Sequence, residues 1–113
     1  MGILKYIFTG DPHNSNSKDY QKEQEKFEKN LNKFMESNRT KDALNEYNFD
    51  SKKLKDIIER SHRLGIHNII FILNRGKILW EVLDIYTKSP NDWTEEDKFM
   101  ATNNFLNKYN IYK

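Results

Sequence analysis

One pair of side chains has a spacing that is used to bind metal. Glu59 and His62 are three residues apart, so on a helix they share one face, as in the ligand motif of di-iron bundles. A di-iron centre needs a second Glu-x-x-His pair and two further carboxylates, and the sequence contains no second pair. The pair therefore favours an ordinary solvated helix surface, and we predict no metal site.

A second histidine, His13, follows Asp11 in a polar stretch. A histidine near a carboxylate could act as a general base, and a small hydrolase or nuclease using His13 or His62 is one hypothesis. Neither histidine has a visible third partner, and the chain has no cysteine. Whether the protein is an enzyme stays open, with the balance against it, and we predict no catalytic residue and no cofactor.

The tripeptide Arg75-Gly76-Lys77 is similar to the end of a phosphate-binding loop. The upstream glycine of that loop is missing, and Ile78 stands where a Ser or Thr would bind magnesium. We therefore exclude a nucleotide loop of this type.

The length and composition of the chain limit the kind of fold that can position these residues. The 113 residues predict a single domain, with an N-terminal arm and loop over 1–16 and a helical body over 17–113. Charged residues make up 32% of the chain and the net charge is only +2. The longest apolar run, Ile69 to Leu73, is far shorter than the roughly 20 residues of a membrane span. We expect a cytoplasmic protein with no membrane partner.

The N-terminal third contains an apolar arm, a loop and a long helix. We predict the arm over residues 3–8 and the loop over 10–17, which is rich in Gly, Pro, Asn and Ser. Residues 18–37 predict an amphipathic helix with a narrow apolar stripe, formed by Tyr20, Phe27, Leu31 and Phe34. Packing within the domain is the favoured interpretation, and a homo-oligomer formed through this helix is the alternative.

Two shorter helices are expected in the middle of the chain. The first covers residues 40–47, and the second covers 51–64 with Asp50 as its N-cap. The second should bury one face, made of Leu54, Ile57, Ile58 and Leu64. Gly65 is the natural residue after its end, where a left-handed backbone is needed, and Ile66 can make the accompanying apolar contact.

Residues 66–88 allow two interpretations. As a helix, they place polar residues in one stripe that is interrupted only at positions 70 and 71. As strands, they form a hairpin over 67–83 that turns at residues 74–77. The helix is favoured because the second half does not alternate, and Gly76 then marks a kink or a break. We expect Trp80 in the core.

A last helix is predicted up to about Asn110, after a capping box formed by Asp92 and Glu95. Its inward residues are Phe99, Phe105, Leu106 and Tyr109. The predicted fold is mainly α, a single-domain bundle of four or five helices with the short N-terminal apolar arm. The alternative is an α+β fold with a hairpin at 67–83.

Charge is segregated along the chain. Residues 51–77 contain seven basic and two acidic side chains, whereas residues 81–97 contain six acidic side chains and one lysine. The plainest interpretation is attraction between neighbouring helices. The alternatives are a bipolar surface that docks a charged protein and a phosphate-contacting face on the basic segment 51–77.

These observations favour a small non-enzymatic protein-binding module. Asn, Lys and Ile make up 40 of the 113 residues and have AT-rich codons. We therefore expect an inhibitor, immunity or accessory protein of an AT-rich bacterium, phage or mobile element. Nucleic-acid binding through 51–77 is the alternative. The predicted partner-binding residues are aromatic or basic: Trp93, Tyr109, Tyr112, Lys53, Arg60 and Arg63.

Overall fold

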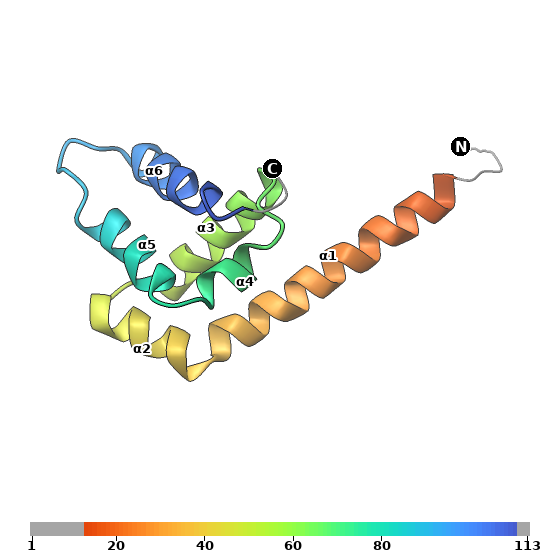
Figure 1. Cartoon of the computed structure of the whole chain (residues 1–113), viewed down its shortest axis with the longest axis horizontal. Coiled ribbons are helices and arrows are strands. Elements are labelled where there is room, and N and C mark those ends of the chain that lie inside the picture. The colour runs from red at the N-terminus through yellow and green to blue at the C-terminus, as the bar shows by residue number, and fades with distance from the viewer. Residues whose placement is uncertain (1–12, 111–113) are drawn as a thin grey trace. The chain divides into compact units, whose positions relative to one another are not determined.

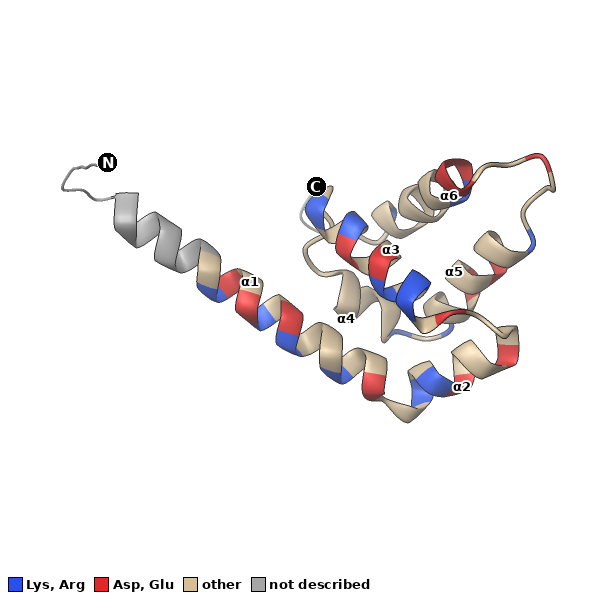
Figure 2. Cartoon of the chain, turned by 180° about the vertical axis from the view of Figure 1, so that it is seen from behind, with Lys and Arg blue, Asp and Glu red and all other residues tan. Residues whose placement is uncertain are grey.

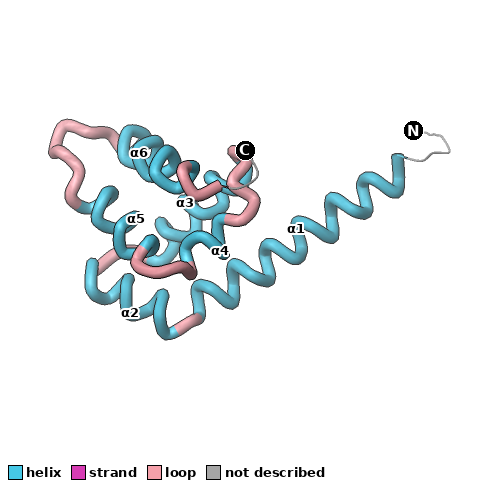
Figure 3. Tube along the Cα trace, viewed as in Figure 1, coloured by secondary structure: helices cyan, strands magenta, loops and turns pink. Residues whose placement is uncertain are grey.

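A computed structural model describes the backbone of residues 13–110 and the side chains of residues 21–110. Over these residues it contains helices and no strand (Figures 1 and 3). The helices are α1 His13–Glu36, α2 Asn38–Tyr47, α3 Ser51–Arg63, α4 Ile69–Leu73, α5 Ile78–Thr87 and α6 Glu95–Asn107. The predicted mainly α bundle is confirmed, whereas the predicted arm over 3–8 and Tyr112 lie outside the described residues.

The chain divides into two compact units, residues 1–32 and 33–113. The described part of the first unit is a stretch of α1, which begins at His13, five residues before the predicted start. The prediction of a loop over 10–17 is therefore wrong for residues 13–17. These residues are Asn, Ser and His, which are only weakly unfavourable in a helix, and they include no Gly or Pro that would stop it. Phe27 and Leu31 are buried, as predicted.

In the second unit, α5 is the central helix. It packs against α2, α4 and α6, and α3 packs against α4. Half of the residues of α5 are buried, namely Ile78, Leu79, Val82, Leu83 and Tyr86. Tyr86 forms a cluster with Ile57 of α3 and Phe99 of α6, and the ring of Phe49 packs against its edge. This cluster joins three helices that are distant in the sequence.

The segment 66–88, for which the sequence allowed either a helix or a hairpin, is helical. It breaks into α4 and α5 at residues 74–77, where Gly76 has a φ of +47°. Glycine adopts this left-handed conformation without steric cost. The prediction of a helix with a break at Gly76 is confirmed, and the hairpin over 67–83 is wrong.

The ends of α3 follow the predicted capping pattern with one difference. The Asp50 side chain accepts a hydrogen bond from Lys52 N at 3.2 Å, and Gly65 has a φ of +109°. The amide of Ile66 donates to Ser61 O and that of Gly65 to His62 O, which together form a Schellman motif. Ile66 is buried, but Leu64 is 60% exposed, so the predicted burial of Leu64 is wrong. In this motif the residue after the glycine turns back onto the helix, and Ile66 takes the apolar position.

The start of α6 also differs from the prediction. Thr94 is its N-cap, because Thr94 Oγ1 accepts from Asp97 N at 3.1 Å and Asp97 Oδ2 accepts from Thr94 N at 3.0 Å. The predicted Asp92–Glu95 capping box is therefore wrong, since Glu95 is turned toward Tyr86 instead. The helix ends at Asn107, which leaves Tyr109 beyond it and exposed rather than inward.

Candidate protein-binding surface

Two of the predicted partner-binding residues, Lys53 and Arg60, form ion pairs within the chain. Arg60 Nη2 lies 3.0 Å from both carboxylate oxygens of Glu96, and Lys53 Nζ lies 3.6 Å from Glu95 Oε1. Figure 2 shows the basic turns of α3 and the acidic start of α6. The basic and acidic segments that the sequence separates thus partly neutralise each other. We call these four residues together with Tyr86 the α3–α6 seam.

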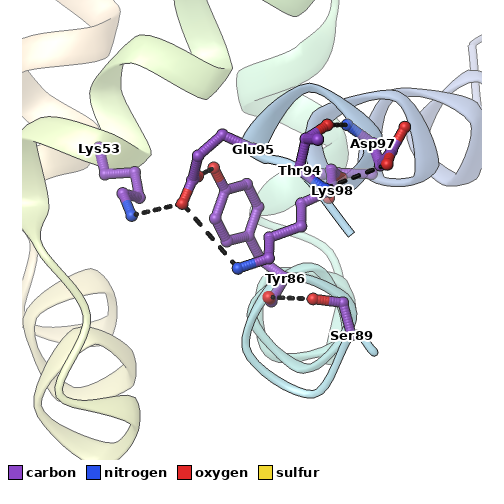
Figure 4. A network of polar contacts seen from close by, with 8 residues as sticks. Lys53, Tyr86, Ser89, Thr94, Glu95, Asp97 and Lys98 are labelled. Atoms are coloured by element: carbon purple, nitrogen blue, oxygen red, sulfur yellow. Dashed lines mark hydrogen bonds and ion pairs between the residues drawn. The ribbon is translucent and has the colours of Figure 1, made fainter. Parts of the chain in front are cut away.

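Tyr86 is the buried part of this seam (Figure 4). Its hydroxyl donates a hydrogen bond to Glu95, and Lys98 Nζ lies 3.9 Å from the same carboxylate. Burial and the bond to Glu95 raise the pKa of Tyr86, and the bond from Tyr86 lowers the pKa of Glu95. At neutral pH the tyrosine is therefore neutral and the glutamate ionised. The arrangement holds α6 against α5 and leaves neither group near a pKa that suits proton transfer at pH 7.

The other predicted partner-binding residues do not gather at one place. Arg63 is exposed at the end of α3. Trp93 precedes α6 and Tyr109 follows it, so these partly exposed aromatic side chains lie at opposite ends of a helix about 20 Å long. Tyr109 also packs edge-on against Phe105 at 5.5 Å. Tyr112 lies outside the described residues.

A group that the sequence did not single out surrounds the break between α4 and α5. Arg75 Cζ lies 5.8 Å from the ring centroid of Phe71, and Lys77 Nζ lies 5.0 Å from that of Trp80. Arg75 and Lys77 are separated only by Gly76, so their Cα atoms are at most about 7 Å apart. Two cation–aromatic pairs therefore meet at one loop, part of which is blue in Figure 2. We call Phe71, Arg75, Lys77 and Trp80 the α4–α5 corner.

Arg39 of α2 holds this corner in place. Its Nη1 donates to Leu73 O at 2.8 Å and its Nη2 donates to Gly76 O at 2.5 Å. The same guanidinium lies 4.9 Å from the ring centroid of Trp80. One side chain thus fixes the end of α4, the left-handed residue of the loop and the aromatic ring.

Trp80 is half-buried, so its predicted place in the core is wrong. Its indole Nε1 donates to Glu46 Oε1 at 3.0 Å, an exposed contact. The neighbouring positions Leu79, Val82 and Leu83 are the ones that point into the core. A buried indole N–H would need a partner in the core, whereas at this position the acceptor lies on the surface of α2.

Phe71 is the clearest residue that the sequence reasoning missed. It is 61% exposed, although it belongs to a helix of five apolar residues in which Ile69, Ile72 and Leu73 are buried. The polar stripe of residues 66–88 is interrupted at positions 70 and 71. This gap could have indicated the exposure of Phe71, because an apolar residue in the polar stripe lies on the solvent side of the helix. Other large apolar side chains that are at least 37% exposed are Leu64, Trp93, Met100 and Tyr109.

The histidines do not complete a metal site among the residues that the structure describes. The rings of His62 and His67 lie 5.2 Å apart and nearly perpendicular, a contact that the spacing across Gly65 did not predict. Over the described part of the chain, no three His, Asp or Glu side chains converge as metal ligands. His13 is the first residue of α1, and its side chain is not among those described.

No helix in the described part of the chain has the length and apolar character needed to cross a membrane. Comparison with protein families, curated proteins and solved structures finds no match to this chain.

Proposed function

We propose that the chain is a small non-enzymatic protein-binding module that contacts its partner through exposed apolar side chains. The observation that carries this proposal is the 61% exposure of Phe71. Aromatic side chains and arginine are both enriched at protein interfaces, where a few residues provide most of the binding energy. A role as an inhibitor, immunity or accessory protein, acting by binding its target, fits a module of this size.

The charges of α3 favour a protein over a nucleic acid as the partner. Two of the cations of the basic segment 51–77, Lys53 and Arg60, are paired with carboxylates of α6. The accessible face of α3 is mixed in sign, with the acidic Asp56 and Glu59 between the basic Lys52, Lys55 and Arg63. A duplex presents a continuous row of phosphates, and a face of mixed sign is poorly suited to it.

The test is affinity capture from the cells that encode the protein, with quantitative mass spectrometry of the bound fraction. The native chain should retain one protein in stoichiometric amount, and Phe71→Ser should lose it because the central apolar contact is gone. Asn74→Ser, at an exposed neighbouring position, is the matched control and should retain it.

Besides capture that persists in Phe71→Ser, two results would contradict this proposal. The first is the absence of any stoichiometric protein when the bait is folded. The second is tight binding of DNA or RNA that weakens steeply with salt and is abolished by Lys53→Glu with Arg60→Glu, which would support the nucleic-acid alternative.

A further inference from the structure

We propose that the α4–α5 corner binds an acidic segment of a protein partner that also carries an apolar or aromatic side chain. This inference rests on the proposed function and specifies its site and the chemistry of its partner. Phe71 and Trp80 would contact the apolar side chain of that segment, and Arg75 and Lys77 would pair with its carboxylates.

The cations of the corner are not neutralised by any carboxylate of the described chain. Lys53, Arg60, Lys88 and Lys98 each have a carboxylate within 4.0 Å. Neither Arg75 nor Lys77 forms such an ion pair with any residue of the described chain; each lies over an aromatic ring instead. A cation–π contact leaves the outer side of the charged group accessible to an anion. The corner therefore presents two positive charges beside two aromatic surfaces.

The corner is held in shape before any partner binds. Arg39 bonds the carbonyls of Leu73 and Gly76 and lies over Trp80, whose indole is in turn bonded to Glu46. A surface that is already ordered loses less conformational entropy on binding, so more of each contact appears as affinity. Arg39 is thus a positioning residue for this site.

The charges around the corner favour a protein segment over a nucleic acid. Two carboxylates border the corner: Glu46 at the Trp80 indole and Glu81, an exposed residue four positions after Lys77. A nucleic-acid strand brings a phosphate with every nucleotide, so some phosphates would meet these carboxylates and be repelled. A protein segment can place its few acidic residues at Arg75 and Lys77 alone. Charge complementarity therefore favours the protein.

The test uses a short synthetic peptide in which Phe and Leu alternate with Glu, added to the full chain labelled with ¹⁵N. The chain has two tryptophans, Trp80 at the corner and Trp93 before α6, so the indole N–H signal of Trp93 is an internal reference. We expect the Trp80 signal to move in a saturable way and the Trp93 signal to stay. A peptide with Lys in place of Glu, and one with Ser in place of Phe and Leu, should bind at least about tenfold more weakly.

Matched variants locate the site. Phe71→Ser and Arg75→Glu should each weaken binding of the acidic peptide by about tenfold or more. Leu64→Ser and Arg63→Glu change an equally exposed apolar residue and an exposed arginine on α3. Both should leave the affinity within about twofold. Arg39→Lys keeps the charge but cannot span two carbonyls, so it should weaken binding and shift the Trp80 signal before any peptide is added.

Several results would overturn the inference. They are a moving Trp93 signal with a fixed Trp80 signal, equal effects of Arg63→Glu and Arg75→Glu, equal binding of the acidic and basic peptides, or tighter binding of a single-stranded oligonucleotide. If the acidic peptide does not bind while the captured partner still depends on Phe71, the inference is wrong and the proposed function stands. If capture does not depend on Phe71 either, the proposed function is also wrong.

Discussion

The same pair of residue types, an arginine over a phenylalanine ring, occurs in two different settings. In the α3–α6 seam, Arg60 Cζ lies 3.9 Å from the ring centroid of Phe99, which is 1% exposed. At the α4–α5 corner, Arg75 Cζ lies 5.8 Å from the ring centroid of Phe71, which is 61% exposed. Arg60 also has the carboxylate of Glu96, whereas Arg75 has no carboxylate partner in the described chain.

The difference lies in what neighbouring elements supply. The first turn of α6 brings Glu95 and Glu96 to the cations of α3, so the charged groups of the seam are paired within the chain. The loop between α4 and α5 contains Arg75 and Lys77 and no acidic residue. The seam therefore contributes to folding, and the corner keeps aromatic surface and positive charge accessible. Stability measurements should distinguish the two regions.

The largest expected effect is that of Phe99, and it should contrast with a small effect of Phe71. Phe99→Ala should lower the free energy of unfolding by about 3–5 kcal/mol, because it empties a buried site at the junction of three helices. Phe71→Ala should change it by no more than about 0.5 kcal/mol, since the ring is mostly in water already. Urea unfolding followed by circular dichroism measures both values. Equal losses would show that the corner is part of the core.

Arg39 should have the next largest effect. Arg39→Met removes two hydrogen bonds from a charged group to backbone carbonyls, and we expect a loss of about 1–2 kcal/mol because the side chain is half-exposed. Lys41→Met, an exposed change two residues away on the same helix, is the control and should be nearly neutral. Hydrogen exchange of the amides of residues 74–78 should become faster in Arg39→Met alone. Unchanged exchange would mean that the loop is ordered without Arg39.

Tyr86→Phe should cost about 1 kcal/mol at neutral pH through the lost bond to Glu95. The pKa of Glu95 is lowered in the folded state, so this contribution is present above the ordinary glutamate value of about 4.3 and is lost as the pH falls through the lowered pKa. The pKa of Tyr86 is raised, so the contribution is present below about pH 10 and is lost as the pH rises through the raised pKa.

The stability difference between the native chain and Tyr86→Phe should thus be flat from about pH 5 to pH 9 and shrink at both extremes. Thermal unfolding in a series of buffers measures it, with Tyr47→Phe as a comparison. In the native chain the Tyr47 hydroxyl donates a hydrogen bond to Asp84, which raises the pKa of Tyr47 to about 12. A Tyr86→Phe difference that varies across neutral pH would contradict the proposed ionisation states.

The smallest effect should come from the Arg60–Glu96 ion pair. A double-mutant cycle with Arg60→Gln and Glu96→Gln should give a coupling below about 1 kcal/mol that shrinks with added salt, because both groups are substantially exposed. Arg75→Gln should leave stability unchanged, since no carboxylate is paired with it in the described chain. A larger effect of Arg75→Gln than of Arg60→Gln would reverse the distinction between the two regions.

Local signals in the sequence predicted most of the helices. The Asp50 cap, the left-handed Gly65 and the break at Gly76 are confirmed, because each depends on a few neighbouring residues. The start of α6 was misplaced because Asp92–Glu95 and Thr94–Asp97 have the same spacing. The choice between them depends on Tyr86, nine residues before Glu95, whose hydroxyl is bonded to that carboxylate.

The candidate site was only partly accessible to sequence reasoning. Lys53 and Arg60 were selected as partner-binding residues because they are basic, and the fold pairs both with α6. Trp80 was placed in the core, and Phe71 was passed over although the gap at positions 70 and 71 in the polar stripe marked the solvent side of the helix. No sequence spacing indicates that Arg39 reaches a loop 37 residues away.

The sequence by itself favoured a mainly helical chain and determined the breaks at Gly65 and Gly76 and the segregation of charge, because these properties arise from residue type and local spacing. The tertiary structure decided which charges are neutralised and which aromatic rings remain in contact with water. Both outcomes depend on contacts between residues distant in the chain: α6 lies against α3 at the seam, and Arg39 of α2 reaches the loop between α4 and α5.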